Sequence, residues 1–194
     1  NIDILVVKTD SFDTDSVIED IVSYSSNSII LVVDYNRKLN FLHKPANIEL
    51  GRDSINFVKF KSLKINTYFL PLLFIFDLVS FTKILSLICL RYRPKICLIE
   101  NVYLTLIISI LKKFGLCGKV IYMSTDWFVT KSNKKSVISY LGNSLFFPFA
   151  DYLACKFSDL VLNPTEKITE ARYKFWGRKI AKKERLYLYK MHVK

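Results

Sequence analysis

Short apolar runs alternate along the chain with longer stretches in which apolar residues recur at helical spacing. The short runs predict strands at residues 2–7, 28–34, 55–60, 95–100, 119–124 and 160–162. The longer stretches predict helices at residues 16–23, 102–114, 136–157 and 164–176. Apolar strands that alternate with helices indicate a parallel sheet covered on both faces. We therefore expect an α/β protein with a Rossmann-like, doubly wound parallel sheet of about six strands and helices on both faces.

One further apolar stretch, residues 67–90, approaches the length of a membrane-spanning helix. It contains Pro71, Asp77 and Lys83, and a charge in the middle of a bilayer is costly. A pair of helices that are buried or lie on a membrane surface is therefore favoured over a span. A helix with Phe and Leu on one face would suit a membrane-surface enzyme, and plain packing beneath the sheet is the alternative.

The net charge of the 194 residues is +12, although 51% of them are hydrophobic. This composition excludes a disordered chain and favours an anionic partner. The excess is greatest in residues 172–194, where basic residues are interleaved with aromatic ones and Glu184 is the one acid. The mixture suits a membrane interface, and a solvated basic surface is the alternative. Because no recognisable nucleic-acid module is present, nucleic acid is not expected as a partner.

The cysteines and histidines argue against metal chemistry. Four cysteines are scattered through apolar segments without CxxC spacing: Cys89, Cys97, Cys117 and Cys155. Such spacing favours reduced core thiols in a cytoplasmic protein over a zinc site. The sequence contains two histidines, His43 and His192, so neither a metal site nor a Ser-His-Asp triad is expected.

Polar residues follow the predicted strand at 95–100 and mark a first part of a candidate site. In open α/β sheets ligands bind at the carboxyl ends of the strands. The Glu100 carboxylate, with Asn101 beside it, could hold sugar hydroxyls there. Asn101 could instead cap the helix that follows. The first predicted strand is followed by residues 8–13, which contain no glycine, so a dinucleotide fingerprint is not expected.

Thr125, Asp126 and Trp127 come directly after the predicted strand at 119–124. Asp126 could accept hydrogen bonds from hydroxyls, or act as a base if its pKa is raised. Trp127 could stack on a sugar ring or a lipid chain. The alternatives are that Asp126 caps a helix or loop and that Trp127 plugs the edge of the sheet.

Asn163 precedes the last predicted helix in a pattern typical of helix starts. Asn163 fits the N-cap, Pro164 the first helical position and Glu166 the third. Capping explains most of this motif. The start of the helix would still face the ligand-binding edge with its positive end, where an anion binds readily.

These segments resemble the amino-terminal domain of GT-B glycosyltransferases, especially the family-4-like group. The resemblance rests on PKICLIEN (94–101), VIYMSTDWF (120–128), DYLACKFSDLVLNPT (151–165) and ITEAR (168–172). It covers residues 90–176, and the first 60 residues by topology. The resemblance implies that Asp126 matches the acceptor-side polar residue of the family, with a catalytic role. Glu100, Asn101, Thr125, Trp127 and Asn163 are expected to bind substrate.

The resemblance also implies a transferase that moves a hexosyl group from a nucleotide-sugar donor to a lipid-linked or polysaccharide acceptor. Residues 1–176 would be the acceptor-side domain, and residues 177–194 a basic tail or the start of a linker. The donor would bind a second domain, in cis or in trans, so the fragment alone would be inactive, with no cofactor or metal of its own. A cytoplasmic protein at the inner face of the membrane is expected. The alternative is a non-catalytic, membrane-associated subunit or binding module of a split transferase.

Overall fold

A computed structural model describes residues 2–9, 28–34, 49–50, 55–61, 70–124, 146–177 and 184–186. Within these residues one sheet has the strand order β3-β4-β2-β1-β5-β6-β7-β8. Its strands are β1 (Ile4–Thr9), β2 (Ser28–Asp34), β3 (Glu49–Leu50), β4 (Ile55–Lys61), β5 (Ile96–Ile99), β6 (Lys119–Met123), β7 (Leu160–Asn163) and β8 (Glu184–Leu186). All neighbouring pairs are parallel except the short β3, which is antiparallel to β4.

The six longer strands follow the order of a Rossmann sheet. When these six strands are renumbered in chain order, their order across the sheet (β4-β2-β1-β5-β6-β7) becomes 3-2-1-4-5-6. This is the doubly wound arrangement. The direction of strand addition reverses between β1 and β5, where Ile4 pairs with Ile96 and Val7 with Ile99. The expected α/β class is confirmed, and all six predicted strands are present.

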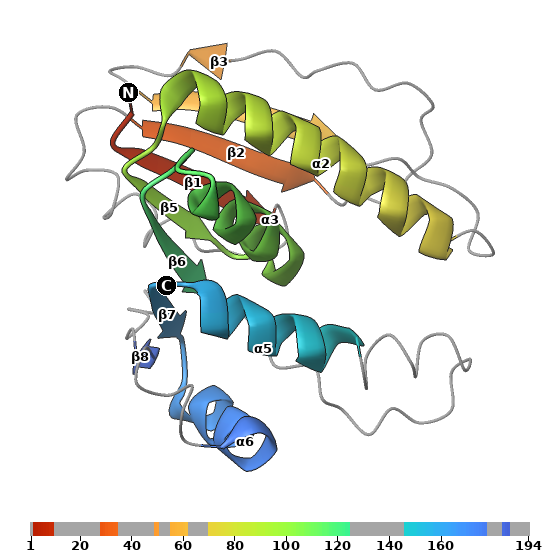
Figure 1. Ribbon diagram of the computed structural model, residues 1–194, viewed down its shortest axis with the longest axis vertical. Helices are drawn as coiled ribbons and strands as arrows, with labels where there is room; N and C mark the ends of the chain where they lie inside the picture. The colour runs from red at the N-terminus through yellow and green to blue at the C-terminus, as the bar shows by residue number, and fades with distance from the viewer. Residues whose placement is uncertain are drawn as a thin grey trace, which may run out of the picture.

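The described helices are α2 (Leu70–Tyr92), α3 (Val102–Lys113), α5 (Phe147–Phe157) and α6 (Glu166–Trp176). Helices α2, α3 and α5 lie side by side in front of the sheet in Figure 1, with α3 in contact with both others. The expected helix pair at 67–90 is wrong, because one continuous helix runs through it. No helix in the described segments is both long enough and apolar enough to cross a bilayer.

The core explains why the sheet strands are apolar throughout. Leu5 and Val7 of β1 pack with Phe81 and Leu85 of α2 and with the buried face of α3. Val6 points to the opposite face because side chains alternate along a strand, yet it is also fully buried. Both faces of the sheet centre are therefore covered, as the continuous apolar pattern predicted.

The ends of several elements follow local chemistry. Helix α3 stops where predicted, and Gly115 adopts φ 72°, a conformation that favours glycine. Pro148 lies in the first turn of α5, where its missing N–H is not needed, so it starts this helix. The predicted helix at 16–23 and the first part of that at 136–157 lie outside the described residues. The segment expected to be a tail or linker contributes β8 to the same sheet.

Candidate functional site

The carboxyl ends of β1, β5, β6 and β7 lie along one edge of the sheet. Ligands of open α/β folds bind at this edge, at the point where strand order reverses. Here that point lies between β1 and β5. Glu100 directly follows β5, and its backbone N–H donates to the Val7 carbonyl of β1 at 3.1 Å. Glu100 is 4% exposed, so the structure places a buried carboxyl group at the switch point.

Asn101 acts as the N-cap of α3. Its Oδ1 accepts hydrogen bonds from the backbone N–H groups of Tyr103 at 2.9 Å and Leu104 at 3.2 Å. Its backbone is extended (φ −88°, ψ 130°), as the residue before a helix requires. The capping role offered by the sequence is therefore confirmed, and it uses Oδ1 of Asn101.

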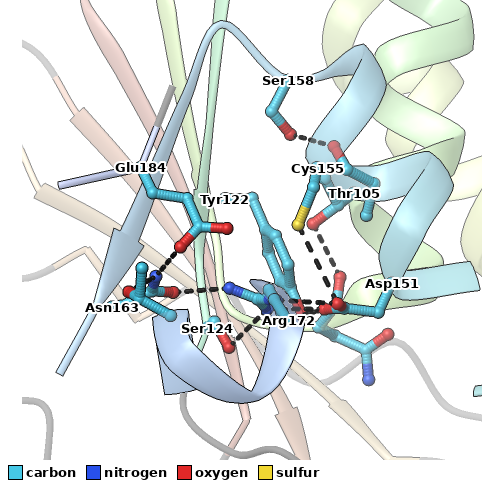
Figure 2. A network of polar contacts seen from close by, with 12 residues as sticks. Thr105, Tyr122, Ser124, Asp151, Cys155, Ser158, Asn163, Arg172 and Glu184 are labelled. Carbon is cyan, nitrogen blue, oxygen red and sulfur yellow. Dashed lines mark hydrogen bonds and ion pairs between the residues drawn. The ribbon is translucent and has the colours of Figure 1, made fainter. Parts of the chain in front are cut away.

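Arg172 of α6 is the centre of a buried polar cluster beneath the carboxyl ends of β6 and β7 (Figure 2). Its Nε and Nη2 donate to the two carboxylate oxygens of Asp151 on α5, at 2.8 and 2.6 Å. Nη1 donates to Asn163 Oδ1 at 2.6 Å, and Nη2 also donates to Ser124 Oγ at 2.9 Å. One guanidinium group thus links two helices to the ends of two strands.

Asn163 and Tyr122 extend this cluster on either side. The Asn163 amide group donates to Thr169 Oγ1 at 2.8 Å and to Glu184 Oε2 of β8 at 2.6 Å. The Tyr122 hydroxyl donates to Asp151 Oδ1 at 3.0 Å. We call the set of Tyr122, Ser124, Asp151, Asn163, Arg172 and Glu184 the Arg172 cluster.

The protonation states inside the cluster follow from burial and from Asp151. Burial alone would lower the pKa of Arg172, but its hydrogen bonds to Asp151 and the charge of that carboxylate raise it above the usual value. The guanidinium group therefore stays charged. Burial, followed by the Asp151 charge, raises the pKa of Tyr122 well above its usual value, so its hydroxyl remains a donor.

The structure corrects the expected role of Asn163 as an N-cap. Asn163 is the last residue of β7, and the N-cap of α6 is Thr165. Pro164 therefore precedes the helix instead of starting it. Asn163 is fully buried and its amide is committed to the Arg172 cluster, so the structure places it inside the protein at the carboxyl end of β7.

Thr125, Asp126 and Trp127 lie outside the described residues. They directly follow Ser124, whose position the structure defines. The Ser124 backbone N–H donates to the Leu162 carbonyl at 2.9 Å, and its side chain accepts from Arg172. The Arg172 cluster therefore holds Ser124, the last described residue before the predicted acceptor-side segment.

Sequence reasoning missed Arg172 and Asp151 because their partners are distant along the chain. In the sequence, Arg172 is one of many basic residues in the carboxyl-terminal stretch. One signal was present: Arg172 follows Ile168 by four residues, and these two are the buried positions of α6. A charged residue on the apolar face of a helix indicates a buried partner.

Comparison with known proteins finds likeness in structure alone. No protein-family model matches the sequence, and no curated protein matches it. The fold resembles sucrose-phosphate synthase from Thermosynechococcus elongatus, with a TM-score of 0.65 and 11% identity over 97% of this chain and 48% of that one. It also resembles an α,α-trehalose-phosphate synthase (UDP-forming) from Burkholderia vietnamiensis, with a TM-score of 0.54 and 11% identity over 89% and 42%.

A third structure with this fold is the UDP-GlcNAc 2-epimerase from Methanocaldococcus jannaschii, with a TM-score of 0.52 and 13% identity over 96% of this chain and 45% of that one. The chain therefore spans about half the length of the structures it matches. The expected likeness to GT-B glycosyltransferases is confirmed at the level of the fold. The family-4-like group stays a prediction.

Proposed function

We propose that the chain is the acceptor-binding half of a glycosyltransferase of the family-4-like group. The enzyme would move a hexosyl group from a nucleotide-sugar donor to a lipid-linked or polysaccharide acceptor. One observation carries this proposal: nearly the whole chain, 97%, has the fold of one part of a sucrose-phosphate synthase. That part amounts to 48% of the synthase, so a complete enzyme of this kind needs a second domain.

The chemistry at the switch point supports an acceptor role for this half. Glu100 supplies a buried carboxyl group where β1 and β5 end, and such a group can accept hydrogen bonds from sugar hydroxyls. The sequence after β1 lacks the glycines that let a backbone approach a pyrophosphate. We assign the donor, a nucleotide sugar, to the second domain, in the same chain or on a partner.

Asp126 is the proposed catalytic residue of this half. It would accept the proton of the acceptor hydroxyl as that oxygen attacks the donor sugar. Thr125 would hold a neighbouring hydroxyl and Trp127 would stack on the acceptor. Their placement depends on Ser124 and on the Arg172 cluster that holds it.

Exposed apolar side chains support contact with a membrane surface. They lie on the helices that cover the front of the sheet in Figure 1 or at the ends of these helices, and each is more than half exposed: Val79, Leu87, Leu90, Ile110, Phe114, Phe146 and Phe149. Together with the net charge of +12, they would suit anionic headgroups at the inner face of a membrane. A lipid-linked acceptor would be reached from such a surface.

The test is a transfer assay with the full-length protein, together with any partner that co-purifies. Radiolabelled nucleotide sugars are offered with membrane-lipid and polysaccharide fractions, and labelled acceptor is counted. We expect Asp126→Asn to lower transfer by about a hundredfold or more, because a positioned base contributes at least that much. Asp3→Asn is the matched control at the opposite edge of the sheet, where Asp3 pairs with the exposed Lys95.

Equal transfer by wild type, Asp126→Asn and Asp3→Asn would remove Asp126 from the site. A different result would favour the alternative. In that case no donor supports transfer by this protein, and a stable partner with its own donor domain is active without this chain. In that alternative the chain is a non-catalytic, membrane-associated subunit or binding module of a split transferase.

A further inference from the structure

The last turns of α2 and α3 share one pattern of exposed apolar and basic residues. Three exposed positions occur at the end of each helix: Leu87, Leu90 and Arg91 in α2, and Ile110, Lys113 and Phe114 in α3. In both helices these positions are i, i+3 and i+4, so they lie on one face of the helix. Each of the four apolar side chains is more than half exposed, and Phe114 is 75% exposed. The opposite faces of both helices pack into the main core, so this pattern faces solvent.

Both helix ends lie at the amino edge of the sheet, opposite the candidate site. Helix α2 leads into β5 and α3 leads into β6, so each helix ends where the next strand begins. The Gly118 N–H donates to the Pro94 carbonyl, and the Lys119 N–H donates to the Lys95 carbonyl, both at 2.8 Å. A Cβ atom at Gly118 would collide with the backbone of Lys95, so the two connections are in close contact. The main chain therefore brings the two exposed patterns to one end of the molecule.

This end of the molecule carries a surplus of positive charge. Residues 78–124 contain seven basic residues and one acid, Glu100, which is buried at the opposite edge of the sheet. Two acids from other segments form ion pairs at this end: Asp3 with Lys95, and Asp159 with Lys112. Four exposed cations take no part in the ion pairs of the described residues: Arg91, Arg93, Lys113 and Lys119.

Stabilisation of the helix ends does not account for the whole pattern. Basic residues in a last turn interact favourably with the negative end of a helix, and this applies to Arg91 and Lys113. Arg93 and Lys119 lie outside both helices, so they have no such role there. The exposed apolar side chains gain nothing from a helix dipole, and their contact with water is unfavourable. A partner that takes up apolar and cationic side chains together would explain both observations.

We propose that this end of the molecule anchors the protein on an anionic lipid bilayer. The four apolar side chains would enter the boundary between headgroups and acyl chains, and the four cations would contact the headgroups. A soluble polyanion would match the charge but would leave the apolar side chains in water. This anchoring rests on the membrane contact of the proposed function and does not depend on the transfer reaction. It assigns that contact to one end of α2 and α3, with the candidate site at the far edge of the sheet.

The test is sedimentation of the full-length protein with lipid vesicles in the absence of any sugar donor. We expect binding to vesicles that contain phosphatidylglycerol, and little binding to vesicles of phosphatidylcholine alone. Added salt should weaken the binding, because it screens the attraction between the cations and the headgroups. Equal binding to both kinds of vesicle, or to neither, would overturn the proposal. Failure to bind would leave the transfer reaction untouched, since that reaction has its own assay.

Single substitutions locate the contact. Leu90→Glu and Phe114→Glu should each weaken binding to the anionic vesicles by about tenfold or more, because a charge replaces an apolar side chain in the bilayer. Arg91→Glu should weaken it roughly fivefold or more, because one attraction to the headgroups is lost. Val79→Glu is the matched control, since Val79 is 62% exposed on the same helix, eleven residues before Leu90. It should bind within about threefold of the wild type, because salt screens a charge at that distance.

Two patterns among these variants would contradict the anchor. Equal losses for Val79→Glu and Leu90→Glu would show that the contact is not confined to the end of α2. A loss with Arg91→Glu, but none with Leu90→Glu or Phe114→Glu, would show contact through charge alone, as expected for a soluble polyanion.

A cross-linking measurement needs no destabilising change. Phe114 is replaced by the photoreactive p-benzoylphenylalanine, which keeps an aromatic side chain at this exposed position, and the vesicle-bound protein is irradiated. We expect adducts with lipid acyl chains at position 114. The same replacement at Tyr173, exposed on α6, is the control and should give few such adducts. Lipid adducts no more frequent at position 114 than at position 173 would overturn the proposal.

Discussion

Arg172 is buried because every partner it needs is buried with it. Desolvation of a charge is costly, and it is repaid here by two hydrogen bonds to Asp151 and one each to Asn163 and Ser124. The planar guanidinium group suits this arrangement, since it donates in fixed directions to a carboxylate and to two further oxygens. At the scale of the residue, the cluster joins the carboxyl ends of β6 and β7 to each other and to α5.

Replacing Arg172 by Met should strongly destabilise the protein. The change leaves the Asp151 carboxylate buried without its counter-charge and Asn163 without its donor. We expect a loss of about 3–5 kcal/mol in the free energy of unfolding, measured by chemical denaturation.

Lys174→Met is the matched control, because Lys174 lies exposed on the same helix. It should change the free energy of unfolding by less than about 0.5 kcal/mol. Arg172→Lys should lie between the two, since it keeps the charge but loses the paired hydrogen bonds. Equal stabilities for Arg172→Met and Lys174→Met would contradict the role given to the cluster.

At the scale of the element, helix starts and turns determine what reaches the two edges of the sheet. Helix α3 begins directly after β5 because Asn101 caps it, which leaves Glu100 at the switch point. Helix α6 begins only at Glu166, because Asn163 remains in β7, paired with Leu186 of β8. At the opposite edge, Gly118 brings the turn after α3 against the start of β5.

Asn101→Ala should cost about 1 kcal/mol in the free energy of unfolding, because two N–H groups of α3 lose their acceptor. Asn101→Ser restores a capping oxygen and should recover most of that loss. If capping is the main role of Asn101, Asn101→Ser should also keep sugar transfer near the wild-type rate. A large loss of transfer in a stably folded Asn101→Ser protein would show that the amide contacts substrate.

Gly118→Ala should destabilise the protein through a steric clash. The added Cβ would meet the backbone of Lys95, which pairs with β6 and has little room to move. We expect a loss of about 1–3 kcal/mol, as for other overpacked sites, measured by thermal or chemical denaturation. Lys119→Ala, at the next and exposed position, is the control. A Gly118→Ala protein as stable as this control would show that the approach of the two segments is loose.

At the scale of the whole molecule, the six longer strands were predictable from the sequence, whereas the single helix α2, the short strands β3 and β8 and the polar cluster were not. Strands such as β2 follow from local apolar runs, which record burial on both faces directly. The Arg172 cluster depends on residues far apart along the chain: Arg172 contacts Asp151 across 21 positions and Ser124 across 48. No local pattern at Asn163 distinguishes an N-cap from a buried strand end, so tertiary contacts decided that case.

The arrangement of the whole sheet also determines which residues belong to the candidate site. The sheet brings Glu100 and the cluster around Ser124 to one edge, because β5 and β6 are parallel neighbours. In the proposed function, this edge is where the acceptor binds. The structures that share the fold are about twice as long as this chain.

The central claim is that this half of the enzyme binds the acceptor. The most direct measurement replaces Trp127 by the photoreactive p-benzoylphenylalanine in the full-length protein and irradiates it with the membrane-lipid or polysaccharide fraction and a nucleotide sugar. The same replacement at Tyr173, exposed on α6, is the control. We predict an adduct at position 127 that contains acceptor sugar or lipid and is suppressed by excess unlabelled fraction. An adduct that carries the nucleotide, or labelling no greater than at position 173, would contradict the account.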